Sequence, residues 1–196
     1  EVDFVFVPSQ GVLRRYGDPF ARCVLRDVYH REAYHTLMTF FSQLVDHIAV
    51  GQHASAAQLL AHIREPNETR LGVSKGKPRG AGIAGGQSLA LIDALTKSKA
   101  VKTGYLNSIE DCELTIPGVG RDKVSDLVTN VIRQHLAMNT AQQCDLHGIP
   151  CEPVALAPHF DANACDWVST YYHLPVIDNK PLKLVPKMIA RYELGI

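Results

Sequence analysis

Five charged side chains in the middle and at the end of the chain are of the types that act on phosphates with a metal ion. Glu68, Asp111, Asp122 and Asp126 are carboxylates that flank two glycine-containing segments, and Lys187 closes an apolar run. Carboxylate oxygens are ligands that Mg²⁺ prefers, and a lysine can assist an attacking water. The set predicts the catalytic residues of a magnesium-dependent nuclease, although no acidic-x-Lys triplet falls on a predicted strand. The alternative is a set of solvated charges and helix caps.

The sequence Pro-Gly-Val-Gly at residues 117–120 precedes the most regular helical pattern in the chain. Gly118 and Gly120 permit positive φ and remove side chains that would block a close approach. The N–H groups at the start of the next helix, together with Arg121 and Lys123, would then face a phosphate oxygen. We expect these four residues to contact nucleic acid.

Residues 107–128 resemble the helix-hairpin-helix DNA-binding motif, in which an apolar-Pro-Gly-apolar-Gly turn joins two short helices. The resemblance implies contacts to the phosphate backbone that do not read the bases. Asp122 departs from the motif because it puts a negative charge where a phosphate would lie. Residues 113–116 depart from it because they favour a strand over a helix. The alternative is a capped strand–turn–helix junction that needs no ligand.

Residues 66–86 form a second glycine-rich segment, with six of the fourteen glycines of the chain. Lys75, Lys77 and Arg79 lie in it, and we expect them to contact nucleic-acid phosphates. Residues 80–85 read Gly-x-Gly-x-x-Gly, but basic residues precede them where a dinucleotide fold needs a buried strand. The segment therefore predicts an anion contact, with a surface loop that binds nothing as the alternative.

Five soft or borderline metal ligands lie within 22 residues of the sequence: Cys144, His147, Cys151, His159 and Cys165. Cys144, His147, Cys151 and Cys165 could supply a tetrahedral Zn²⁺ site, although their spacing matches no standard zinc motif. The five cysteines of the chain are an odd number without regular spacing, which favours free thiols and a cytoplasmic protein.

Hydrophobic periodicity predicts an α+β fold with a helical front half, a glycine-rich loop, and a back half of helix and short strands. Helices are expected at residues 20–50, 54–63, 88–97 and 121–146. Strands are expected at residues 3–7, around Val101, at 167–173 and at 182–185, with a turn at 178–181. We expect the first two helices to form an antiparallel pair.

Composition sets the broad class of the protein. The 196 residues include 46% hydrophobic and 20% charged side chains, which excludes an intrinsically disordered chain and fits one α+β domain. We expect no membrane-spanning helix, and a start at Glu1 rather than Met indicates a fragment of a longer chain.

Charge separates along a chain whose net formal charge is zero: residues 64–102 carry eight positive and three negative side chains, whereas 103–166 carry three and nine. The sequence favours a protein that binds DNA or RNA through the phosphate backbone, as a Mg²⁺-dependent nuclease or as a subunit of a larger machine. A non-catalytic interaction domain and a phosphate-handling small-molecule enzyme are the two alternatives. The charge pattern also fits two faces that attract each other inside one fold.

Overall fold

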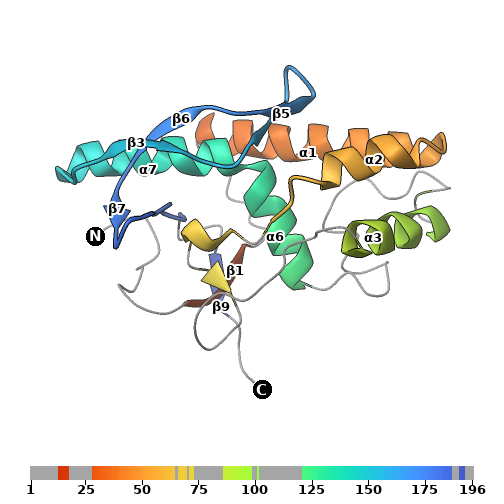
Figure 1. The fold of residues 1–196 in the computed structure, drawn as a ribbon, viewed down its shortest axis with the longest axis horizontal. Helices are drawn as coiled ribbons and strands as arrows, with labels where there is room; N and C mark the ends of the chain where they lie inside the picture. Colours follow the sequence, from red (N-terminus) through yellow and green to blue (C-terminus); the bar gives the residue numbers. More distant parts are fainter. Residues whose placement is uncertain are drawn as a thin grey trace.

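The structure is a computed structural model that describes residues 13–17, 28–64, 66–69, 71–72, 86–98, 101, 121–186 and 190–192. Helix α1 (Val28–Ala49) is followed by α2 (His53–Leu60), which folds back along it in an antiparallel pair (Figure 1). Gly51, with φ +77°, takes the left-handed conformation that ends α1. Helix α3 (Gly86–Lys97) packs against both. The three helices confirm the predicted ones within a few residues, except that residues 20–27 lie outside the described residues.

The predicted helix at 121–146 is two helices, α6 (Arg121–Val131) and α7 (Arg133–His147), so the expectation of one continuous helix is wrong. They meet at a bend at Ile132, which leaves helical geometry with φ −87° and ψ 16°. The side chain of Asn130 donates to the carbonyl of Asp126, four residues back, and so enters the hydrogen-bond ladder of the helix. Such an insertion and a β-branched stretch both favour a break in a helix.

A long bent hairpin lies across α7 and reaches α1 at its tip (Figure 1). Its base pairs β3 (Glu152–Ala155) with β6 (Tyr171–Leu174), and its tip pairs β4 (His159–Asp161) with β5 (Asp166–Val168), both antiparallel. Between base and tip, three residues of the first arm stand opposite two of the second. The predicted strand at 167–173 is confirmed as strand structure but not as one strand, because the irregular pair Ser169–Thr170 divides it into β5 and β6.

A small mixed sheet lies on the other side of α6. In it β1 (Leu13–Gly17) pairs in parallel with β2 (Leu71–Gly72) and antiparallel with β9 (Ala190–Tyr192), and β1 contacts α6. A 3₁₀ turn, η2 (Asn67–Thr69), precedes β2. The glycine-rich segment at residues 66–86 was expected to be a loop, so η2 and β2 correct that expectation.

A short hairpin of β7 (Val176–Ile177) and β8 (Lys180–Pro181) follows the long one. Asp178 and Asn179 have φ of 53° and 58°, so the predicted turn at 178–181 is confirmed. Residues 182–185 are buried but form no strand, because the N–H groups of Leu182, Lys183 and Leu184 donate to Pro175, Glu68 and Thr140 rather than to a neighbouring strand. Val101 lies in a helical turn, which corrects the strand expected there.

The hydrophobic core lies between α1, α2, α3 and α6, and the tip of the long hairpin closes it. Phe40 of α1 meets Phe160 and Trp167 edge to face, with ring centroids 5.1 and 5.9 Å apart. The indole N–H of Trp167 donates to the carbonyl of Leu59, 3.0 Å away. These contacts fix the hairpin tip over the α1–α2 pair.

The arrangement of helices before short strands confirms the predicted α+β class. Among the described residues, no helix is both long enough and apolar enough to cross a membrane.

Candidate functional site

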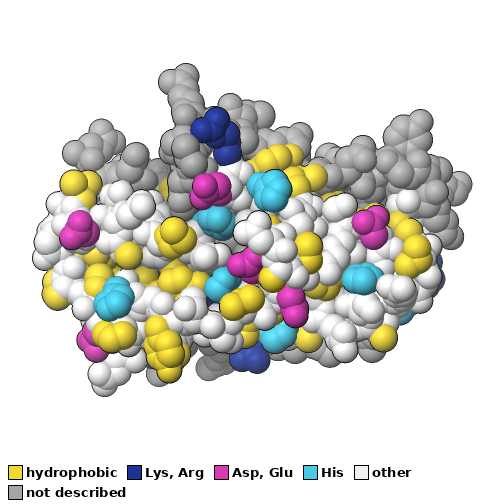
Figure 2. Space-filling model, turned by 90° about the horizontal axis from the view of Figure 1, so that it is seen from above, with side chains coloured by type: hydrophobic (Ala, Val, Ile, Leu, Met, Phe, Trp, Pro, Cys, Tyr) yellow, Lys and Arg dark blue, Asp and Glu magenta, His cyan; other side chains and the backbone are white. Residues whose placement is uncertain are grey.

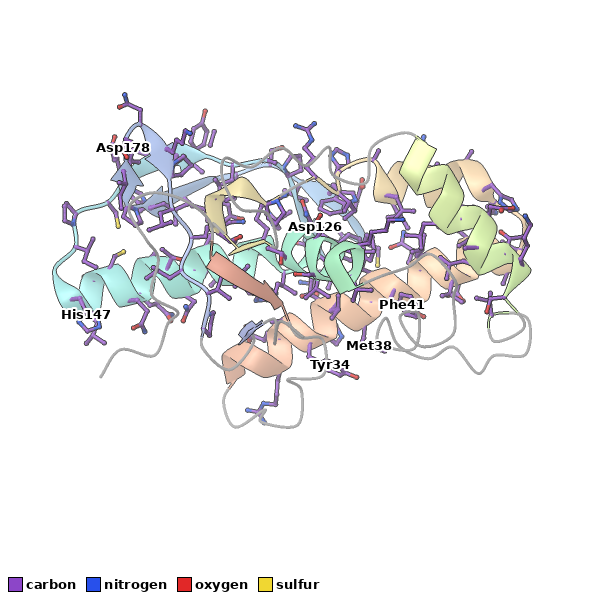
Figure 3. All side chains as sticks on the ribbon, turned by 90° about the horizontal axis from the view of Figure 1, so that it is seen from below. Tyr34, Met38, Phe41, Asp126, His147 and Asp178 are labelled. Atoms are coloured by element: carbon purple, nitrogen blue, oxygen red, sulfur yellow. The ribbon has the colours of Figure 1, made fainter. Side chains whose placement is uncertain are left out.

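The structure describes the side chains of two of the five predicted catalytic residues. Glu68 lies in η2 and Asp126 in the middle of α6, near the centre of the molecule (Figure 3). Asp111 and Lys187 lie outside the described residues, and Asp122 is described only through the backbone of α6. The magnesium centre therefore stays a prediction.

The predicted nucleic-acid contacts are described only in part. Arg121 begins α6, with its side chain outside the description, and Lys123 is half-buried in the first turn. The rest of that set lies outside the described residues: Lys75, Lys77, Arg79, Gly118 and Gly120.

Glu68 is held by two buried cations. Its Oε1 lies 3.0 Å from Nζ of Lys183 and 3.6 Å from Nε of Arg133. The backbone N–H of Lys183 also donates to the carbonyl of Glu68, 2.8 Å away. The Lys183 and Arg133 side chains are 0% and 1% exposed, so this cluster, which we call the ionic centre, lies inside the molecule.

Burial and charge oppose each other in the ionic centre. Burial raises the pKa of Glu68, but Lys183, a backbone hydrogen bond and Arg133 together bring that pKa below its ordinary value. Burial lowers the pKa of Lys183 to about 8, although Glu68 acts against this shift. Glu68 is thus an anion whose charge two protein cations already balance, which makes it a weak candidate for a Mg²⁺ ligand.

Asn130 connects the ionic centre to the chain that enters it. Its Oδ1 accepts from the backbone N–H of Arg64 at 3.2 Å, and its Nδ2 donates to the carbonyl of Arg64 at 2.6 Å. The same Oδ1 accepts from Nη2 of Arg133, and Nη1 of Arg133 donates to the carbonyl of Pro158. One guanidinium therefore joins the α6–α7 bend, η2 and the long hairpin.

A second set of polar side chains joins the long hairpin to the helices. The hydroxyl of Tyr172 and Nδ1 of His159 are 2.8 Å apart, and Oγ1 of Thr36 is 2.9 Å from Nε2 of His135. Burial lowers the pKa of both imidazoles and raises the pKa of Tyr172 to about 12. Both histidines are therefore neutral near pH 7.

Thr36 and His135 lie at the floor of an open hollow of about 670 Å³ between α1, α7 and the hairpin tip. Glu32, His35 and Gln134 are among the more exposed side chains around it. The hydroxyls of Thr39, Thr96, Thr129 and Thr140 each donate to the carbonyl four residues back. Thr36 instead points across to another helix, so the hydroxyl–imidazole pair is a specific contact between α1 and α7.

The face that carries this hollow has few described cations, and Arg31 is the cation that lines the hollow itself. Figure 2 shows Lys and Arg only sparsely among its described side chains, with Asp, Glu and His spread between hydrophobic groups. A phosphate backbone needs concentrated positive charge. We therefore do not expect nucleic acid to bind this face.

The four predicted zinc ligands are all described, and they do not come together as a group. Cys144 and Cys151 lie at the carboxyl end of α7, whereas Cys165 lies at the hairpin tip, where its thiol donates to the carbonyl of Ala162 at 3.5 Å. Figure 3 shows His147 at the outer end of α7. In the described part of the chain, no three His, Cys, Asp or Glu side chains could hold a metal ion together.

Sequence reasoning missed Lys183, Arg133 and Asn130. The signal for Lys183 was a lysine inside the apolar run Leu-Lys-Leu-Val, in which every residue is buried. A strand with one solvated face would explain that pattern equally well. For Arg133 the signal was a lone cation in the buried stripe of a predicted helix.

Comparison with known proteins gives a family and nothing more specific. The model of the family described as domain of unknown function DUF8370 matches residues 1–196. The chain belongs to the DUF8370 family. No curated protein and no solved structure matches this DUF8370 chain.

Proposed function

We propose that the chain binds the phosphate backbone of DNA or RNA at the amino end of α6. The observation that carries this proposal is the start of α6 at Arg121, directly after the sequence Pro-Gly-Val-Gly at residues 117–120. The first N–H groups of a helix have no acceptor inside it, and the helix dipole favours an anion beside them. The buried residues Val124, Leu127 and Val131 anchor α6 in the core.

The path of the chain supports a contribution from the basic glycine-rich segment. Strand β2 ends at Gly72, and Lys75, Lys77 and Arg79 follow it in the sequence. β2 pairs with β1, and β1 contacts α6. The basic segment therefore leaves the sheet that packs on α6.

The orientation of α6 fits the distribution of charge. Its carboxyl end joins α7 beside the long hairpin, and its amino end points away from the face with the hollow (Figure 1). The cation-poor face and the proposed contact thus belong to different sides of the molecule.

We also propose that the protein works in the cytoplasm, since the described cysteines Cys144, Cys151 and Cys165 are free.

Binding to labelled single- and double-stranded DNA and RNA over a series of salt concentrations tests the proposal. We expect the binding constant to fall steeply with salt, because each phosphate contact releases a counterion. The double variant Lys77→Glu with Arg79→Glu should bind at least tenfold more weakly and should lower the salt slope by about two. Failure of the natural chain to bind any of these nucleic acids at low salt overturns the proposal.

The matched control is Arg31→Glu with Lys180→Glu, an equal change of charge at two exposed positions away from α6. It should bind within about twofold of the natural chain. An equal loss in both double variants would mean that net charge, and not a defined contact, governs binding. Running the assay with and without Mg²⁺ and following the length of the nucleic acid tests the predicted nuclease activity.

A further inference from the structure

The turn after α7 brings two cysteines from different elements together. Gly148 takes the left-handed conformation with φ +63°, and the N–H of Ile149 donates to the carbonyl of Cys144 at 2.8 Å. This closure reverses the chain at the end of the helix. Cys151, two residues beyond Ile149, therefore returns over the last turn of α7 and directly precedes β3.

The two thiols lie close enough to interact. The thiol of Cys144 hydrogen-bonds to the side chain of Cys151, and the thiol of Cys151 donates to the carbonyl of Ile149 at 3.7 Å. Cys144 is 1% exposed, whereas Cys151 is half-buried. One partner is thus accessible to a reagent and the other lies directly behind it.

We propose that Cys144 and Cys151 are a reversible redox-modification site, at which a low-molecular-weight disulfide oxidises the two thiols to one intramolecular disulfide. The inference is independent of nucleic-acid binding. The proposed disulfide would join the end of α7 to the residue before β3, and the long hairpin packs on α7.

The chemistry proceeds in two exchanges. The thiolate of Cys151 attacks one sulfur of the small disulfide, whose S–S bond breaks and releases one small thiol. The sulfur of Cys144 then loses its proton to solvent and attacks Sγ of Cys151, which forms the protein disulfide and releases the second small thiol. The two protein thiols are oxidised and the small disulfide is reduced to two thiols.

The environment sets the order of these steps. Burial and the contact with Cys151 raise the pKa of Cys144 to about 12, so its thiol is a poor first nucleophile. Exposure makes Cys151 the sulfur that meets the reagent. We therefore expect a mixed disulfide on Cys151 to precede the intramolecular one.

Oxidation of the full chain with oxidised glutathione, followed by alkylation and intact-mass measurement, tests the proposal. The five thiols should fall to three without dimer formation, and dithiothreitol should restore all five. Cleavage with trypsin and with a protease that cuts before Asp145, Asp161 and Asp166 puts the three neighbouring cysteines on separate peptides. A linked pair of peptides 134–144 and 145–160 is expected. A link to Cys165, or no loss of thiols, overturns the proposal.

Two variants make the assignment specific. Cys151→Ser should abolish the loss of thiols, and the matched control Cys165→Ser should still lose two. The oxidised natural chain should melt about 5 °C higher than the reduced one, because the bond removes freedom from the unfolded chain. Equal melting temperatures of oxidised and reduced Cys165→Ser, or loss of two thiols from Cys151→Ser, contradict the proposed link.

Discussion

At the scale of single residues, burying the charges of the ionic centre costs free energy, and removing one of its charges would leave the others uncompensated. Taking Lys183 and Arg133 out of water costs several kcal/mol for each ion, and Glu68 is the described carboxylate that compensates for this. Nζ of Lys183 and Nε of Arg133 have no well-aligned hydrogen-bond acceptor among the described residues. The stability of the fold therefore depends strongly on the charge of Glu68.

Replacing Glu68 with Gln should reduce the free energy of unfolding by about 3–5 kcal/mol, because two buried cations lose their counter-charge. Urea denaturation followed by circular dichroism measures this. The matched change Glu152→Gln, at an exposed position of β3, should alter stability by less than about 0.5 kcal/mol. Equal stability of the two variants would mean that the ionic centre does not hold the fold.

The buried Lys183 predicts a rise in stability with pH. Its pKa is about 8 in the folded chain and 10.5 ordinarily, so between these values the unfolded chain binds more protons. This contribution to stability therefore rises from about pH 8 to pH 10.5. Cys144, with its pKa raised to about 12, acts in the opposite direction above its ordinary 9.0. The measurement is the difference in urea stability between the natural chain and Lys183→Met, which should grow in favour of the natural chain across this range. A constant difference would contradict it.

At the scale of elements, the helices follow from the sequence more completely than the strands. The apolar residues of α1, α2 and α3 recur at helical spacing and bury one face each, so those helices could be predicted almost to their ends. The break at Ile132 was not predicted, because the pattern of apolar residues runs on through it; Asn130, which bonds to Asp126 beside the break, also contacts Arg64, 66 residues away in the chain. The strands of the long hairpin are short and half-exposed, and packing on α7 rather than local pattern determines them.

The hairpin tip carries its own reporter, since Trp167 is the single tryptophan of the chain. The ring of His62 lies 5.1 Å from it, and burial, with Arg64 beside it, lowers the pKa of His62 below 6.5. A protonated imidazole quenches indole fluorescence, so the emission of Trp167 should fall as the pH drops below 6.5 while the chain stays folded. His62→Gln should remove this step, whereas His173→Gln, an exposed histidine of β6, should keep it. The same step in both variants would place the quencher elsewhere.

At the scale of the whole molecule, the two sides of α6 have different chemistry. One side carries α1, α7 and the hairpin, with neutral histidines and few cations (Figure 2). The other carries the mixed sheet and the amino end of the helix (Figure 1). The sequence showed the separation of charge along the chain, and among the described residues few cations lie on the side with α1, α7 and the hairpin. Of the predicted site, Glu68 lies in a polar cluster, whereas Cys165 lies at the hairpin tip, apart from Cys144 and Cys151 at the carboxyl end of α7.

Hydrogen exchange can test this division in the whole protein. On addition of DNA or RNA, amide exchange in residues 121–124 should slow, because a phosphate would accept from the first N–H groups of α6. Residues 161–167 at the hairpin tip should exchange at an unchanged rate. The fluorescence emission of Trp167 should also stay constant. Slower exchange at the tip with no change in α6 would assign binding to the opposite side.

The two arms of the long hairpin differ in length, and this difference determines what the carbonyl of Pro158 can bind. Five residues separate Val154 from Phe160 on one arm, but four separate Trp167 from Tyr172 on the other. The mismatch takes residues 156–158 out of the ladder and leaves the Pro158 carbonyl to Arg133. Inserting one residue after Ser169 would make the two arms equal and the hairpin more regular. The carbonyl of Pro158 would then no longer accept from the guanidinium of Arg133. Natural selection is thus expected to preserve the length of this second arm more strictly than the identity of the side chains along it.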